Sequence, residues 1–294
     1  MRRGRRVLLE LFQHEFVQNA FLAGTIVAIV TAVIGYFAVL RAQAFAAHGL
    51  SHISFAGATG AVLLGISSLL GMFALTLLAA LGMGALGERV RGRDVEIGMV
   101  LSFALGLGVL FISLYTQYAS ETVSVLFGSI LTVTRRDVLI TLGCGIATLL
   151  LMALLFRPLL FASIDPEMAQ ARGVPVRLLS IVFMLLLAIT VAEAVQVVGV
   201  LLVFALLIAP AASAVRLVRN PFLAIALAMA LGLLFTWGGL ALAFAGHFPV
   251  SFYIATMAAL TYFASVRIAR FRSPRRYKPL PHPSREYIPA RVRR

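Results

Sequence analysis

Long stretches without a charged side chain constrain this chain more than any other feature. A helix that crosses a membrane needs roughly 20 predominantly apolar residues. The two longest charge-free stretches, 42–87 and 220–266, are each long enough for two crossings, and the Gly-His-Phe-Pro sequence at 246–249 marks the break in the second. The shorter stretches that supply further crossings are 16–40, 97–120, 138–156 and 194–215. The pattern predicts an all-α polytopic membrane protein with eight or nine transmembrane helices.

The composition excludes an ordinary soluble domain. Hydrophobic residues make up 61% of the chain and charged residues 12%, and the mean hydropathy is +1.01. Soluble domains carry about 25% charged residues. The alternation of polar and apolar residues that outer-membrane barrels require is absent from the sequence. We expect one transmembrane domain, 18–271, and no additional soluble domain.

Positive charge is concentrated beside the predicted crossings. The net charge is +14, and arginines cluster at 89–93, 216–219 and 267–276. The positive-inside rule places such clusters in the cytoplasm. The tail 272–294 is rich in proline and arginine and has no hydrophobic periodicity, so we expect it to be disordered. Its place beside a crossing favours anionic lipid over nucleic acid as its partner. Residues 1–17 combine four arginines with helically spaced apolar residues, which indicates a basic amphipathic arm at the membrane surface.

Two histidines, His48 and His52, stand four residues apart inside a charge-free stretch. Residues with this spacing share one face of a helix, and neutral imidazole is the commonest metal ligand among side chains. Burying imidazoles in a membrane costs free energy unless they find partners. The pair predicts a metal-binding face, and the alternative is two histidines bonded to backbone carbonyls.

Other polar residues give weaker signals. Glu121 is expected near an extracytoplasmic mouth, where a carboxylate attracts cations, and His247 is expected in a turn near the same entrance. Both are secondary candidates for metal contact. Glu193 and Gln196 are expected in a loop or at a helix end between two crossings. Cys144, the only cysteine, is expected to be a small packed residue.

The segment 163–175 is polar, although it lies between two crossings. Asp165 is a good N-cap, Pro166 suits the first helical position, and Gly173 suits the end of a helix. Glu167 adds negative charge to the first turn, where the helix dipole favours it. These signals predict a short helix on the membrane surface, which either docks a partner or simply connects two crossings.

Four segments, in the same order, resemble permeases of ATP-binding-cassette (ABC) importers for zinc, manganese or iron. Residues 39–52 (Val-Leu-Arg … Ala-His-Gly-Leu-Ser-His) resemble the family's first loop and metal-facing helix. Residues 121–131, with Leu-Phe-Gly at 126–128, and residues 198–212, with Gly199 and Pro210, resemble two further elements. The segment 163–175 resembles the coupling helix. The resemblance covers roughly residues 18–268.

The resemblance implies a type II ABC-importer-like permease bundle in the plasma (inner) membrane. It implies a homodimer that works by alternating access, with separate cytoplasmic ATP-binding subunits and an extracytoplasmic metal-binding protein. It also assigns ATPase coupling to the short helix, through Asp165, Pro166, Glu167, Met168, Ala169 and Gly173. The chain has no phosphate-binding glycine loop of its own, so we expect it not to be an enzyme and to hold no permanent cofactor.

The resemblance also bears on the transported metal. His52 matches a histidine of the family, whereas His48 stands where members often have aspartate. Two imidazoles suit Zn²⁺ better than Mn²⁺, which favours oxygen ligands. We therefore expect a divalent transition metal, with zinc favoured and manganese or iron as the alternatives. A stand-alone channel or secondary transporter is a less favoured class.

The predicted topology rests on the short helix at 165–173. If that helix is cytoplasmic, the four crossings after it return the C-terminus to the same side. The arginine cluster at 89–93 then also lies inside, and the three crossings before it place the N-terminus outside. Small residues at 56–65 and 82–87 predict helices that pack closely.

Overall fold

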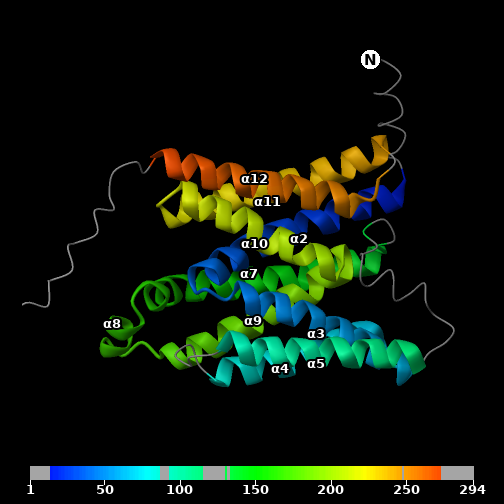
Figure 1. Ribbon diagram of the computed structural model, residues 1–294, viewed down its shortest axis with the longest axis horizontal. Helices are drawn as coiled ribbons and strands as arrows, with labels where there is room; N and C mark the ends of the chain where they lie inside the picture. Colours follow the sequence, from blue (N-terminus) through cyan, green and yellow to red (C-terminus); the bar gives the residue numbers. More distant parts are fainter. Residues whose placement is uncertain (1–13, 87–92, 115–129, 131–132, 247, 273–294) are drawn as a thin grey trace, which may run out of the picture.

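The computed structural model describes residues 14–86, 93–114, 130, 133–246 and 248–272, and these residues form an α-helical bundle without strands (Figure 1). The residues before 14, the tail from 273, Glu121 and His247 lie outside this description. The helices, labelled as in Figure 1, are α2 (Glu15–Leu40), α3 (Ala44–Leu63), α4 (Ser68–Leu86), α5 (Arg93–Leu114), α7 (Arg135–Ile164), α8 (Pro166–Ala171), α9 (Val176–Val198), α10 (Val200–Leu217), α11 (Pro221–Ala245) and α12 (Val250–Arg272).

The predicted number of crossings is confirmed for the described residues. Eight helices there are long and apolar enough to cross a membrane, and α3, with 20 residues, is a ninth long helix. The predicted break in the last charge-free stretch is also confirmed, because α11 ends at Ala245 and α12 begins at Val250.

The helices lie side by side, with α2, α7, α9 and α10 in the middle of the bundle (Figure 1). α11 and α12 flank this centre on one side, and α3, α4 and α5 flank it on the other. The central helices are the most buried: in their most apolar stretches, 67% of the residues of α2 and 72% of those of α9 are buried. In the same stretches of α5 and α12, only 17% of the residues are buried. The outer helices therefore present apolar side chains such as Phe103 and Phe263 to the surroundings, as a lipid-facing helix must.

The chain direction agrees with the topology predicted from the sequence. α7 leads into α8, and the four long helices that follow bring the end of α12 back to the same end of the bundle (Figure 1). The turn between α2 and α3 also lies there, since its Arg41 contacts Ser163 and Ser180 beside α8. The first residues of α2 therefore lie at the opposite end from α8.

Close helix contacts occur where glycines meet. A Cβ atom on Gly57 of α3 would lie 2.3 Å from the carbonyl oxygen of Gly71 of α4, and a Cβ on Gly71 would lie 2.2 Å from that of Gly57. The first small-residue segment thus packs closely, as predicted. In the second segment, Gly84 approaches Ile181 of α9, whereas Gly82 has open space beside it.

Candidate functional site

The two histidines lie in the first half of α3 and face each other. Their ring centroids are 4.7 Å apart, with the ring planes at 89°. Phe204 of α10 lies against His48 at a centroid distance of 5.2 Å. His52 is buried and His48 is half-buried. The pair therefore sits where α3 meets α10, with an aromatic ring on one side of it.

The Nδ1 atoms of both histidines are buried without a hydrogen-bond partner among the described residues. A buried polar atom without a partner costs free energy. The alternative was that backbone carbonyls accept hydrogen bonds from both rings. No such bond is made at the two Nδ1 atoms. Two neighbouring imidazoles with unused nitrogens are suited to bind a metal ion.

The pair alone does not make a complete metal site. No group of three His, Cys, Asp or Glu side chains comes together within the described part of the chain. A tetrahedral zinc site takes four ligands, so two of the positions around an ion would be filled from elsewhere. The secondary candidates Glu121 and His247 lie outside the described residues, and their contact with an ion stays a prediction.

The short helix α8 has both of the predicted end signals. The Asp165 carboxylate accepts a hydrogen bond of 2.9 Å from the backbone N–H of Met168, and Pro166 takes the first helical position. At the other end Gly173 has a φ of +79°, and the N–H groups of Gly173 and Val174 bond to the carbonyls of Gln170 and Ala169. This pair of bonds is a Schellman motif, so α8 is fixed at both ends.

The side chains of α8 divide into an inner and an outer face. Ala169 is 0% exposed and packs into the bundle, whereas Met168 is 50% exposed and Glu167 also lies at the surface. A partner that docks on α8 therefore meets Glu167 and Met168, and Ala169 seats the helix from behind. The sequence alone did not separate these two roles.

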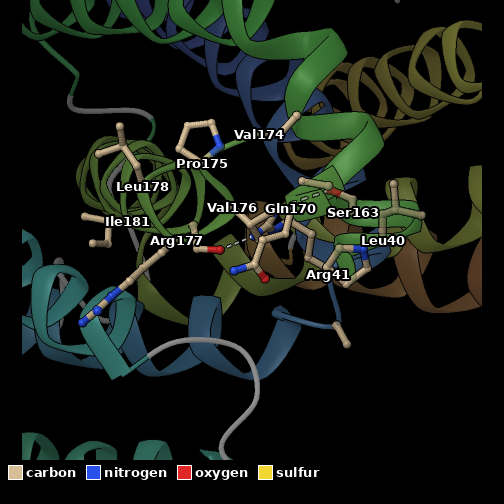
Figure 2. A pocket seen from close by; sticks show the side chains of 14 residues that line it. Leu40, Arg41, Ser163, Gln170, Val174, Pro175, Val176, Arg177, Leu178 and Ile181 are labelled. Atoms are coloured by element: carbon tan, nitrogen blue, oxygen red, sulfur yellow. Dashed lines mark hydrogen bonds between the residues drawn. The ribbon is translucent and has the colours of Figure 1, made fainter. Parts of the chain in front are cut away.

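Arg41 connects the region of α8 to the helix that carries the histidines. Its Nη2 donates a 2.6 Å hydrogen bond to the Ser180 hydroxyl, and its Nη1 donates one of 3.3 Å to the Ser163 hydroxyl (Figure 2). The guanidinium carbon lies 5.4 Å from the ring centre of Phe183, in cation–π range. Arg41 precedes α3 by three residues, so this contact fixes the start of the histidine helix.

A cavity of about 970 Å³ lies beside Arg41, between α8, the turn at 40–42 and the start of α9 (Figure 2). Pro166 and Gln170 of α8 line it on one side. Sequence reasoning missed it, because its walls come from segments far apart in the chain.

The prediction for two polar residues near the end of α9 was wrong for one of them. Gln196 lies in the last turn of α9, at a helix end as expected, whereas Glu193 lies further inside the helix and is only 3% exposed. Its carboxyl group lies near the thiol of Cys144 on α7. The chain reverses later, at Gly199, whose φ of +85° is accessible chiefly to glycine.

Comparison with known proteins decides the family. The model of the ABC 3 transport family matches residues 13–269. This chain belongs to that family. It is therefore the permease subunit of a metal ABC importer and a multi-pass protein of the inner membrane, and ATP hydrolysis belongs to a separate subunit.

Three relatives illustrate the range of the family. The chain is 33% identical over 269 residues to the "Manganese transport system membrane protein MntC" of Halalkalibacterium halodurans, with 90% of each chain covered. It is 31% identical over 230 residues to the "High-affinity zinc uptake system membrane protein ZnuB" of Haemophilus influenzae, covering 78% of this chain and 88% of that protein. The structure of PsaBC from Streptococcus pneumoniae in complex with Fab matches with a TM-score of 0.80 and 30% identity, over 89% of this chain and 94% of that one.

Proposed function

We propose that this permease imports manganese and that the ion passes the face formed by His48 and His52. The observation that carries the proposal is the pair of buried, unpartnered Nδ1 atoms on facing rings, of which His52 is buried and His48 half-buried. In a family whose members carry metal ions, a ligand-rich face inside the bundle is the natural place for the ion. An incomplete site also suits transport, because an ion that is held too tightly does not leave.

The choice of manganese over zinc rests on the relatives. The relative from H. halodurans is named for manganese and matches this chain over more of its length than the zinc-named relative from H. influenzae. The sequence alone favoured zinc, on the ground that two imidazoles are borderline-soft ligands. Zinc is the second candidate for that reason. Oxygen ligands from water or from other helices, added to the two imidazoles, would form a site that suits Mn²⁺.

The expected partners occupy opposite ends of the bundle. Cytoplasmic ATP-binding subunits dock on the exposed side of α8, through Glu167 and Met168. An extracytoplasmic metal-binding protein delivers the ion at the other end, where α2 and α7 begin. Two copies of the permease form the transporter and move by alternating access, and the ion meets further ligands during that movement.

The test is uptake by the complete importer in proteoliposomes, with Mn²⁺, Zn²⁺ and Fe²⁺ in competition. His52→Ala removes one ligand and should lower uptake to near background while ATP binding and assembly persist. His14→Ala is the matched control, since His14 is exposed before α2. Uptake at the wild-type rate by His52→Ala would exclude the histidine face from the pathway. A preference for Zn²⁺ over Mn²⁺ in the wild type would exclude manganese as the main cargo.

A further inference from the structure

A second set of polar side chains lies between α7 and α9, apart from the histidine face. Two of its members, Thr141 and Glu193, are almost completely buried, at 1% and 3% exposure. The others are half-buried. The set consists of Asp137, Thr141 and Cys144 on α7 and Glu193 and Gln196 on α9. Polar groups inside a membrane bundle usually mark function, because burying them is costly.

Two pairs of these residues are in contact across the interface between α7 and α9. Gln196 Nε2 donates a 2.9 Å hydrogen bond to Asp137 Oδ1, and the Glu193 carboxyl lies near the Cys144 thiol. Thr141 lies between Asp137 and Cys144 on α7, four residues after the first and three before the second. Such spacings put all three on the same side of the helix.

Three oxygen atoms in this set have no hydrogen-bond partner among the described residues. They are Glu193 Oε1, Gln196 Oε1 and Thr141 Oγ1, and all three atoms are buried. The amide group of Gln196 already uses its nitrogen on Asp137, which leaves its oxygen as an unused acceptor. A buried carboxyl oxygen without a partner is costly, and a cation or a hydrogen-bond donor at this place would satisfy it.

We infer that the α7–α9 cluster is a second binding station for a hard divalent cation, held through carboxylate, hydroxyl and amide oxygens. Such oxygens are the ligands that Mn²⁺ prefers. The inference rests on the proposed function, since the ion is the same cargo. The cluster lies near the start of α7, at the end of the bundle opposite α8. Glu193 precedes the Gly199 turn by six residues, and Phe204, five residues beyond that turn, packs against His48.

Two stations of different chemistry fit an import pathway. An oxygen-lined station near the extracytoplasmic end would take the ion first, and the imidazole face would take it next. Conduction through several weak sites is faster than release from one tight site. The second station also supplies oxygen ligands, which the histidine pair lacks.

Cys144 provides a specific probe of this station, because it is the only cysteine of the chain. We would measure the rate at which N-ethylmaleimide alkylates Cys144 in the assembled importer, in nanodiscs and without nucleotide, by mass spectrometry of the permease. With Mn²⁺ at ten times its dissociation constant, alkylation should slow roughly tenfold, because only about one station in eleven stays empty. The same alkylation measurement with Mg²⁺ or Zn²⁺ at the same concentration tests which ion this station prefers.

The variants separate this station from the histidine face. Glu193→Gln keeps the size of the side chain and an oxygen for the thiol but removes the charge, and it should abolish the protection of Cys144 by Mn²⁺. Thr141→Val, which keeps the shape of the side chain, should weaken the protection. Glu96→Gln is the matched control, since Glu96 is exposed on α5, and it should retain full protection. Each variant is first checked for assembly by size-exclusion chromatography.

His52→Ala distinguishes failure of this inference from failure of the proposed function. If both are right, His52→Ala loses uptake but keeps the protection of Cys144. If Glu193→Gln and Thr141→Val both assemble and leave the protection unchanged, the oxygen station does not exist, and the histidine proposal stands on its own test. If Mn²⁺ gives no protection in the wild type, the cluster is an internal hydrogen-bond network and the inference is wrong.

Discussion

Arg41 Nη2 and the Ser180 hydroxyl are joined by a 2.6 Å hydrogen bond that fastens the turn before α3 to the second turn of α9. Arg41 is only 9% exposed and Ser180 4%. The same arginine reaches Ser163, at the end of α7 next to α8. Arg41 therefore links the end of α7, next to α8, and the start of α9 to the turn before the histidine helix.

Ser180→Ala should weaken the coupling between ATP hydrolysis and transport. The substitution removes an acceptor from a buried charged donor, which costs about 1.5–3 kcal/mol for such hydrogen bonds. We expect lower thermal stability and more ATP hydrolysed per ion imported, measured together in proteoliposomes. Ser102→Ala is the control, because Ser102 is exposed on α5. An unchanged ratio of ATP to ion in Ser180→Ala would show that Arg41 only stabilises the fold.

Substitutions in α8 should separate docking from folding. Met168→Arg changes an exposed side chain, so it should weaken binding of the ATP-binding subunits without lowering the melting temperature of the permease. Ala169→Arg forces a charge into a position that is 0% exposed, so it should displace α8 and reduce stability as well. Pull-down of the ATP-binding subunit and thermal unfolding distinguish the two. Normal pull-down and transport by Met168→Arg would contradict a docking role for this face.

The sequence predicted the ends of α8 and the break between α11 and α12 well, because residues at these positions have strong local conformational preferences. Asp165, Pro166 and Gly173 define α8 by their own conformational preferences, and the Gly-His-Phe-Pro sequence separates α11 from α12. The count of four crossings after α8 likewise predicted that α8 and the end of α12 share one end of the bundle.

The buried polar contacts could not be predicted, since their partners are distant in sequence. Arg41 bonds to serines 122 and 139 residues away, and nothing near Arg41 in the sequence identifies them. Glu193 was misplaced because a charged residue was taken as the end of a crossing. The available signal was the absence of glycine or proline between Glu193 and Gly199, together with the helical spacing of Glu193 and Gln196.

Gly71→Ala should disrupt the contact that holds α3 against α4. The added Cβ would lie 2.2 Å from the carbonyl oxygen of Gly57 and 2.4 Å from the Ala61 Cβ, and backbone atoms cannot move aside as a side chain does. Overpacking of this kind costs about 1–3 kcal/mol. Gly82→Ala is a matched control in the same helix, because nothing lies within 4 Å of its added Cβ. Thermal unfolding of both variants measures the difference, and equal melting temperatures would mean that α3 and α4 are not packed through Gly71.

His48→Asp should increase the preference of the importer for manganese over zinc. The substitution replaces an imidazole, a borderline-soft ligand, with a hard carboxylate next to His52. Mn²⁺ favours oxygen ligands, whereas imidazole nitrogen suits Zn²⁺. A tenfold change in the uptake ratio of Mn²⁺ to Zn²⁺ corresponds to about 1.4 kcal/mol, a magnitude that one ligand exchange can produce. The measurement is competitive uptake at matched expression, with His14→Asp as the control for the added charge. Because the ring centres of His48 and His52 are 4.7 Å apart, an ion held between the two rings would be within reach of both. An unchanged uptake ratio in His48→Asp would therefore mean that His48 is not a ligand and that His52 acts with ligands from elsewhere.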